Sequence, residues 1–206
     1  MVRNIILLLS FITFSLFTQS FSNLSHIGSK SMGTAGAVVS DVNNLETVFY
    51  NPAGLVNIKP YSFIAGTTDL YGLKFLNHQF LSVSLPYSSA ISIQQLGTNS
   101  SGFSDKNLST EKSITFSKAF FLLDDANSKL SIGYNINGLI FYQNASAGVN
   151  GDGVGGLSSG ETSVLGLDIG VYASLRNKIS FGAFIKNINN PYIGKGSSSS
   201  QLPRRM

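Results

Sequence analysis

The sequence predicts an all-β protein, an antiparallel transmembrane β-barrel with a small N-terminal plug in its lumen. Three observations lead to this prediction: an apolar leader, long tracts in which apolar and polar residues alternate with a period of two, and connections that alternate between short and long. Charged residues are only 12% of the 206 residues, about half the share that is usual in soluble proteins. The 15 Phe, 8 Tyr and 21 Gly residues favour strands and turns over helices.

Residues 1–22 have the organisation of a secretory signal peptide. Arg3 provides the positive charge, Ile5–Phe17 is apolar, and polar and small residues follow. The apolar run is shorter than the ~20 residues that a membrane-spanning helix needs, although a membrane anchor is the alternative interpretation. Ser20 and Ser22 suit a cleavage site, but the usual Ala-x-Ala form is missing, so the cleavage point stays open.

Residues 23–59 are expected to form the plug, a compact segment that precedes the first strand. Asp41 is a suitable N-cap for a short helix through Leu45–Phe49. In the stretch "VFYNPAGL", Asn51 can cap the next turn, and Pro52 then stands at a first helical position, where its missing N–H costs nothing. The predicted plug motif is therefore Asn51, Pro52, Ala53 and Gly54.

Residues 60–206 are expected to form the barrel portion. In the tract Thr162–Arg176, one alternating set is aliphatic and the other is polar or small, which a helix would scatter around its circumference. We predict seven strands, at 61–71, 78–86, 90–96, 112–122, 129–142, 162–176 and 178–188. The aliphatic faces are expected to meet lipid. The residues expected to face the lumen are Asn135, Asn137, Asp168, Tyr172 and Lys186.

The connections between the predicted strands alternate in length. Those at 86–90, 124–128 and 176–177 are short, whereas those at 72–77, 97–111, 143–161 and 189–201 are longer. An outer-membrane barrel has short periplasmic turns and longer external loops, so the alternation favours that architecture. A secreted β-sandwich or a surface-layer protein with the same alternation is the alternative. Lys118 does not fit, because it interrupts an apolar face.

The number of predicted strands suggests a truncated barrel. Single-chain bacterial barrels have an even number of strands, and open strand edges are not viable in lipid. The sequence ends shortly after a predicted loop, where the next strand would start. We therefore expect this chain to be roughly the first half of a longer barrel.

Two stretches carry a resemblance to known outer-membrane proteins. The stretch "MGTAGAVVSDVNNLETVFYNPAGL" resembles the N-terminal hatch of the FadL/TodX-type transporters and of the related PorV/PorQ-type proteins of type IX secretion. The stretch "GLDIGVYASLRNKISFGAFIKNINNP", with the later "LPRR", is similar to the PorV/PorQ side. The resemblance covers most of Met32–Arg205. It implies a barrel of about fourteen strands in a bacterial outer membrane, with Asn51, Pro52 and Ala53 in the hatch.

Two functions follow from this resemblance. The first is passive uptake of hydrophobic small molecules, such as fatty acids or hydrocarbons, across the outer membrane. The alternative is a PorV/PorQ-like component of type IX protein secretion, which suits loops that are rich in Ser, Gly and Asn. The expected partners are outer-membrane lipid and either a hydrophobic small molecule or a secreted protein. The net charge of +4 is too small to indicate nucleic-acid binding.

Other motifs are weak, and we expect neither enzymatic activity nor a cofactor. No arrangement of a nucleophile and a base stands out in the sequence. Gly151–Gly156 satisfies G-x-G-x-x-G but follows a loop and opens no helix, and the overlapping "NGDG" has too few carboxylates for calcium. His26 and His78 are isolated in the sequence and suggest no metal site.

Overall fold

The computed structural model describes residues 27–34, 37–72, 75–99, 107–145, 158–176, 178–193, 200–202 and 204. The predicted signal peptide, His26 and the glycine-rich motif at 151–156 lie outside the described residues.

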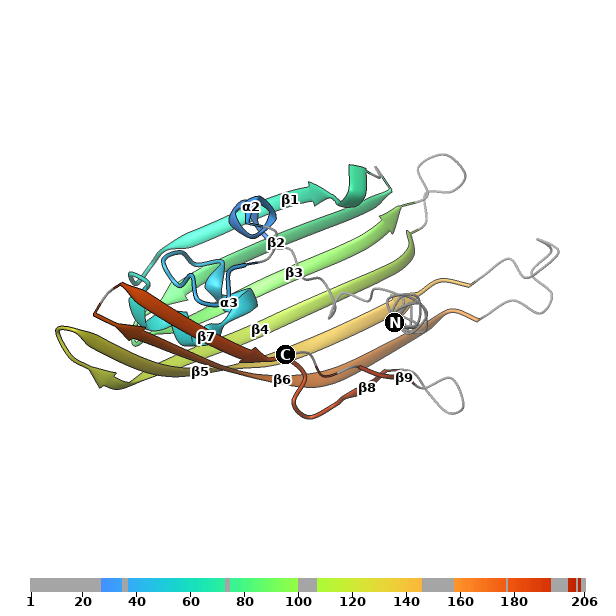
Figure 1. Cartoon of the computed structure of the whole chain (residues 1–206). Coiled ribbons are helices and arrows are strands. Elements are labelled where there is room, and N and C mark those ends of the chain that lie inside the picture. The colour runs from blue at the N-terminus through green and yellow to red at the C-terminus, as the bar shows by residue number, and fades with distance from the viewer. Residues whose placement is uncertain are drawn as a thin grey trace, which may run out of the picture.

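The fold is a seven-stranded antiparallel sheet that curls into a half-barrel (Figure 1). Each strand pairs with the next one along the chain, and all seven predicted strands are present. Their bounds are β1 Phe63–Asp69, β2 Leu76–Leu85, β3 Ser89–Asn99, β4 Asn107–Asp124, β5 Ser128–Gln143, β6 Gly160–Leu175 and β7 Ile179–Ile185. Strand β4 begins five residues before the predicted start at 112, because the polar residues Ser109–Glu111 continue the ladder with β5.

The short connections lie at one end of the sheet and the longer ones at the other (Figure 1). The β2–β3 turn contains Tyr87 and Ser88 at φ 61° and 54°, and Arg176 in the β6–β7 turn has φ 53°. The β1–β2 connection contains the 3₁₀ helix η3, Leu70–Gly72. Lys118, the predicted misfit, is opposite Ser89 at the short-turn end, where its ammonium donates to the Tyr87 carbonyl.

The N-terminal segment, defined here as the described part of residues 27–58, lies on the concave inner face of the sheet (Figure 1). It contains helix α2, Ser29–Gly33, helix α3, Thr47–Tyr50, and the 3₁₀ helix η2, Pro52–Asn57. The prediction of Asp41 as a helix cap was wrong. Helix α3 begins two residues later than expected and has Glu46 at its N-cap without a side-chain hydrogen bond. The Asp41 carboxylate is instead 2.5 Å from the Lys30 ammonium.

A second small hairpin follows the main sheet, where the sequence predicted only a loop at 189–201. Strand β8, Tyr192–Ile193, pairs with β9, Ser200–Gln201. Each strand has only two residues, too few for an alternating pattern to be recognised in the sequence.

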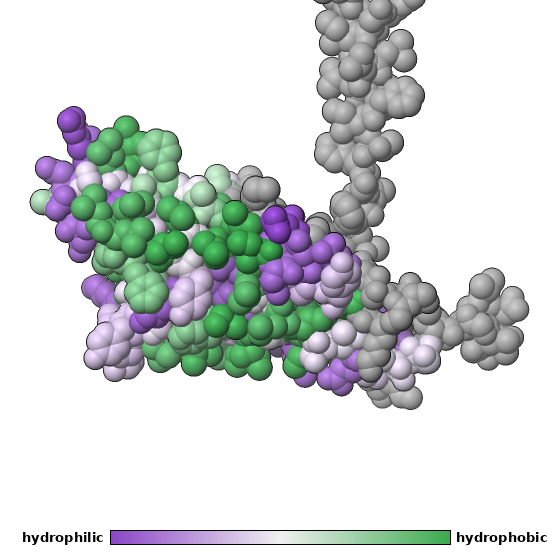
Figure 2. Space-filling view, turned by 90° about the horizontal axis from the view of Figure 1, so that it is seen from below, coloured by the Kyte–Doolittle hydropathy of each residue, from purple (hydrophilic) through white to green (hydrophobic). Residues whose placement is uncertain are grey.

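The two faces of the sheet have the opposite polarity to those of a soluble protein. Hydrophobic side chains are exposed on the outer face, including Ile91, Ile93, Ile114, Phe116, Ile136, Leu165, Ile169 and Leu175. Polar side chains are buried on the inner face, including Ser82, Ser92, Ser113, Thr115, Ser117, Ser131, Asn135, Asn137 and Asp168. Figure 2 shows hydrophobic residues along the middle of the molecule and hydrophilic residues toward its ends.

Candidate functional site

The candidate site is the contact between the N-terminal segment and the inner face of strands β4–β7. Asn51, which is fully buried, organises the segment's side of this contact. Its side-chain oxygen accepts from the Ala53 N–H at 3.2 Å, as the predicted cap requires. Its amide nitrogen donates to the Val39 carbonyl at 2.8 Å and to the Val171 carbonyl of β6 at 2.9 Å. One side chain therefore joins two parts of the N-terminal segment to strand β6.

The turn at Asn51–Ala53 packs against glycine residues on the inner face of the sheet, called the wall below. Gly133 of β5 and Gly170 of β6 are directly opposite each other in the ladder. A Cβ atom on Gly133 would overlap the backbone between Pro52 and Ala53, and one on Gly170 would overlap the Asn51 side chain. Gly182 of β7 likewise leaves room for the Val39 carbonyl. The absence of side chains at these positions is what lets the turn lie against the sheet backbone.

A network of polar side chains surrounds the buried carboxylate of Asp168, which is only 1% exposed. Its Oδ2 accepts from Asn137 Nδ2 at 2.7 Å and from Asn135 Nδ2 at 3.3 Å, and its Oδ1 accepts from the Asn187 N–H at 2.9 Å. Thr115 donates to the Asn137 side-chain oxygen at 2.8 Å. A buried carboxylate is costly unless hydrogen bonds satisfy it, and here neutral N–H donors supply them.

The network extends to the N-terminal segment. Asn135 Nδ2 also donates to the Val48 carbonyl at 3.0 Å, and Ser131 Oγ donates to the Ala53 carbonyl at 2.9 Å. The Val48 carbonyl belongs to the last turn of α3, where carbonyl groups lack partners within the helix. Asn135 therefore caps α3 from the sheet, and Ser131 adds a hydrogen bond to the start of η2.

An apolar contact lies beside the polar one, against strands β2–β4. Val48, Phe49 and Leu55 form a buried cluster with Phe80, Ala90 and Ala119 of the wall. The rings of Phe49 and Phe80 meet edge to face, with centroids 5.7 Å apart. Tyr50 in the same cluster donates to the Ile27 carbonyl at 2.5 Å, and burial raises the pKa of its hydroxyl to about 12. The segment is therefore held by both hydrogen bonds and hydrophobic packing.

The structure brings most of the predicted site residues together. Asn51, Pro52, Ala53 and Gly54 are all buried in the contact, and Asn135, Asn137, Asp168 and Tyr172 lie on the inner face. Lys186 directly follows strand β7, and the N–H of the next residue, Asn187, donates to the Asp168 carboxylate. Whether the inner face borders a closed lumen stays a prediction.

Sequence reasoning missed the glycine pair and Asn187. The period of two does place Gly133 and Gly170 on the polar face, but only the ladder register sets them opposite each other. Asn187 has φ 54°, a left-handed conformation that Asn adopts more readily than most residues, and this lets the chain turn back over Asp168.

Comparisons with known proteins identify no relative: no family model, curated protein or solved structure matches the chain. Within the described residues, no helix is both long and apolar enough to cross a membrane. The described His, Asp and Glu side chains also form no group of three or more that could hold a metal ion, and the chain has no Cys.

We predict that Gly133→Ala and Gly170→Ala will displace the N-terminal segment in the full-length protein. The added methyl group overlaps the turn, and such overpacking typically costs about 1–3 kcal/mol. Limited proteolysis within residues 27–58 should become faster in both variants. The matched control is Gly138→Ala on the same strand, where a Cβ would meet only the Ile114 carbonyl oxygen, at 3.7 Å. Equal cleavage rates for Gly133→Ala and Gly138→Ala would contradict the seating of the turn.

We also predict that Asn51→Ala will loosen the segment while leaving the sheet folded. The change removes an amide that bonds both Val39 and Val171, at an expected cost of about 1–3 kcal/mol for the carbonyl groups left without this donor. Proteolysis of residues 27–58 measures the effect. Asn43→Ala is the control, because Asn43 is exposed and bonds only to the neighbouring Asp41, at 3.3 Å. Loss of the whole fold in Asn51→Ala would mean that the segment is part of the core rather than a separable cover.

Proposed function

We propose that this chain is part of a bacterial outer-membrane β-barrel of the FadL/TodX-like superfamily that takes up hydrophobic small molecules passively. In this proposal residues 23–59 form the luminal plug and the outer face of the sheet meets lipid. The observation that carries it is the polarity of the two faces, with an exposed apolar outer face and a buried polar inner face.

Strand length supports the placement in a bilayer. On the outer face of β5 the side chains from Leu130 to Ile140 are apolar apart from Gly138, and on β6 they are apolar from Leu165 to Leu175. Each stretch covers about 11 residues, which is what a tilted transmembrane strand needs. Strands β2–β6 each pair with a neighbour on both sides, and such pairing is the condition for strands to exist in hydrocarbon.

The chemistry of the contact between the N-terminal segment and the inner face supports the proposal that the plug can move. Much of this contact consists of hydrogen bonds to Asn51, Ser131 and Asn135, which water can replace if the segment shifts. The apolar part of the contact, around Phe49 and Phe80, would offer a hydrophobic solute favourable surface along the same wall. A pathway beside a displaceable plug is what passive uptake requires.

The alternative function is a PorV/PorQ-like role in type IX protein secretion. It is favoured by the connections between β3 and β4, residues 100–106, and between β5 and β6, residues 144–159, whose Ser, Gly and Asn residues suit contacts with an exported protein better than capture of a hydrocarbon. We prefer uptake because a secretion role confined to the external loops would make no use of the contact between the plug and the inner face.

The membrane placement predicts that tolerance to charge depends on depth along one strand. In the full-length protein, Ile169→Arg should block assembly because Arg near the bilayer midplane costs about 2–4 kcal/mol. Ser163→Arg lies on the same outer face of β6, nearer the loop end, and should assemble because the cost there is about 0–1 kcal/mol. Heat-modifiable gel mobility of outer-membrane fractions measures assembly. Similar tolerance of both substitutions would argue for a water-exposed outer face.

Uptake itself is tested in cells that lack other fatty-acid importers. Cells expressing the full-length protein should accumulate a fluorescent long-chain fatty acid faster than cells with an empty vector, and Gly133→Ala should change that rate while Gly138→Ala should not. If wild-type cells show no uptake but lose surface delivery of exported proteins when the gene is deleted, the secretion alternative replaces the proposal.

A further inference from the structure

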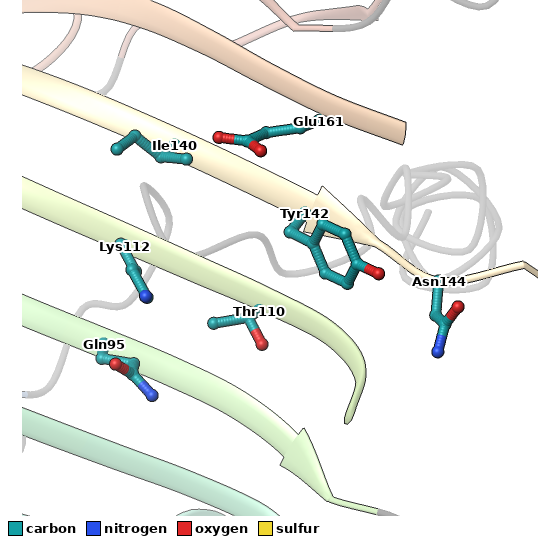
Figure 3. Close-up of a pocket in the computed structure, with 7 residues that line it drawn as sticks. All are labelled: Gln95, Thr110, Lys112, Ile140, Tyr142, Asn144 and Glu161. Carbon is teal, nitrogen blue, oxygen red and sulfur yellow. The ribbon is translucent and has the colours of Figure 1, made fainter. Parts of the chain in front are cut away.

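A hollow of about 560 Å³ opens on the outer face of the sheet, toward the ends of the strands that lead into the long connections (Figure 3). It is away from the N-terminal segment, because its strand residues belong to the alternating set that points outward. The lining residues are Gln95, Thr110, Lys112, Ile140, Tyr142, Asn144 and Glu161.

Two adjacent rows of the ladder build this hollow. In the first row Gln95 is opposite Lys112, which is opposite Ile140. In the second row Thr110 is opposite Tyr142, which is opposite Glu161. Figure 3 shows the side chains distributed over the neighbouring strands, with Lys112 and Glu161 on the two strands that flank Ile140 and Tyr142. The register therefore fixes the relative positions of these side chains.

The two sides of the hollow have opposite chemistry. On the β3–β4 side, Lys112, Gln95 and Thr110 all carry hydrogen-bond donors, a set that suits an anionic group. On the β5–β6 side, the Glu161 carboxylate and the Tyr142 ring suit a cation. Among the described residues, Lys112 and Glu161 form no salt bridge with each other, so they do not neutralise each other. Lys112 and Glu161 are two strands apart across the sheet and offset by two residues along the strands, so their Cα atoms are about 12 Å apart. This separation leaves room for a zwitterionic group.

An apolar notch continues from the hollow toward the middle of the strands. Gly138 is the next outward-facing residue of β5 after Ile140, and it leaves a gap between Ile114 and Leu165 on the two flanking strands. Those two side chains are 53% and 55% exposed, so they form the raised walls of the gap. The notch therefore has the width of one missing side chain and hydrophobic sides.

We propose that the hollow and the notch together bind one amphiphile, a phosphoethanolamine-bearing lipid. Its phosphate contacts Lys112, Gln95 and Thr110, its ammonium contacts Glu161 and Tyr142, and an acyl chain lies over Gly138 between Ile114 and Leu165. This inference rests on the proposed placement of the outer face in a membrane. It goes beyond that placement by specifying one lipid site and its headgroup chemistry.

The test is native mass spectrometry of the full-length protein in detergent, titrated with dimyristoyl phosphatidylethanolamine. We expect Lys112→Gln and Glu161→Gln each to weaken lipid binding about threefold to fivefold, which is the range of a partly exposed ion pair. Gly138→Leu should also weaken binding, because its side chain fills the notch. Lys118→Gln is the matched control, a lysine on the same strand and face but at the other end, and it should bind lipid as the wild type does.

Three results would overturn the inference. Equal binding by wild type and all variants would show that the lipid associates with the outer face without a site. Equal binding of dimyristoyl phosphatidic acid, unaffected by Glu161→Gln, would exclude recognition of the ammonium group. Equal binding of free phosphoethanolamine would exclude the acyl chain. In each case a heat-modifiable, assembled protein would show that the membrane placement itself has not failed.

Discussion

The close approach of the Asn51–Ala53 turn to the backbone of β5 and β6 is the constraint on which the rest of the structure depends. It requires glycine at positions 133 and 170, and it requires these glycines to be opposite each other in the ladder. A register slip of one residue would bring Ile132 or Tyr134 to the inner face, where no space exists for them. The same slip would move Asn135 and Asn137 to the outer face and dismantle the network around Asp168. The turn, the register and the polarity of both faces are therefore mutually dependent.

The buried network follows from this constraint. Because glycines bring the segment against the wall, the neighbouring inner-face side chains are excluded from water and must find partners. Asn135 links the N-terminal segment to the network, because its amide nitrogen donates to the Val48 carbonyl of the segment and to the Asp168 carboxylate of β6. The network is only partly satisfied, since the side-chain oxygen of Asn135 is buried without a hydrogen-bond partner, but the bonds that it does make are directional. This favours a single position of the segment on β4–β6, whereas the apolar contact with β2–β4 is less directional.

The fold could be predicted largely from local patterns in the sequence. The period of two identified the seven strands and the residues on each face, and Asn51 followed by Pro52 identified the start of η2. Asp41 failed as a cap because α3 begins only at Thr47, six positions later, and the Asp41 carboxylate pairs with Lys30 instead. The glycine pair, Asn187 and the hollow on the outer face depend on which residues of different strands are opposite each other, and no local pattern contains that information.

The central claim is that the N-terminal segment lies on the inner face of the sheet, against Gly133 and Ser131. Cysteine cross-linking with a short bifunctional thiol reagent tests it most directly, since the chain has no native Cys. Ala53→Cys paired with Ser131→Cys should form an intramolecular cross-link in outer-membrane fractions, because the hydrogen bond from Ser131 Oγ to the Ala53 carbonyl, at 2.9 Å, makes the two residues neighbours. Ala53→Cys paired with Ile132→Cys should form none, because Ile132 belongs to the alternating set that points outward. Cross-linking of the Ile132 pair, or of neither pair in an assembled barrel, would contradict the claim.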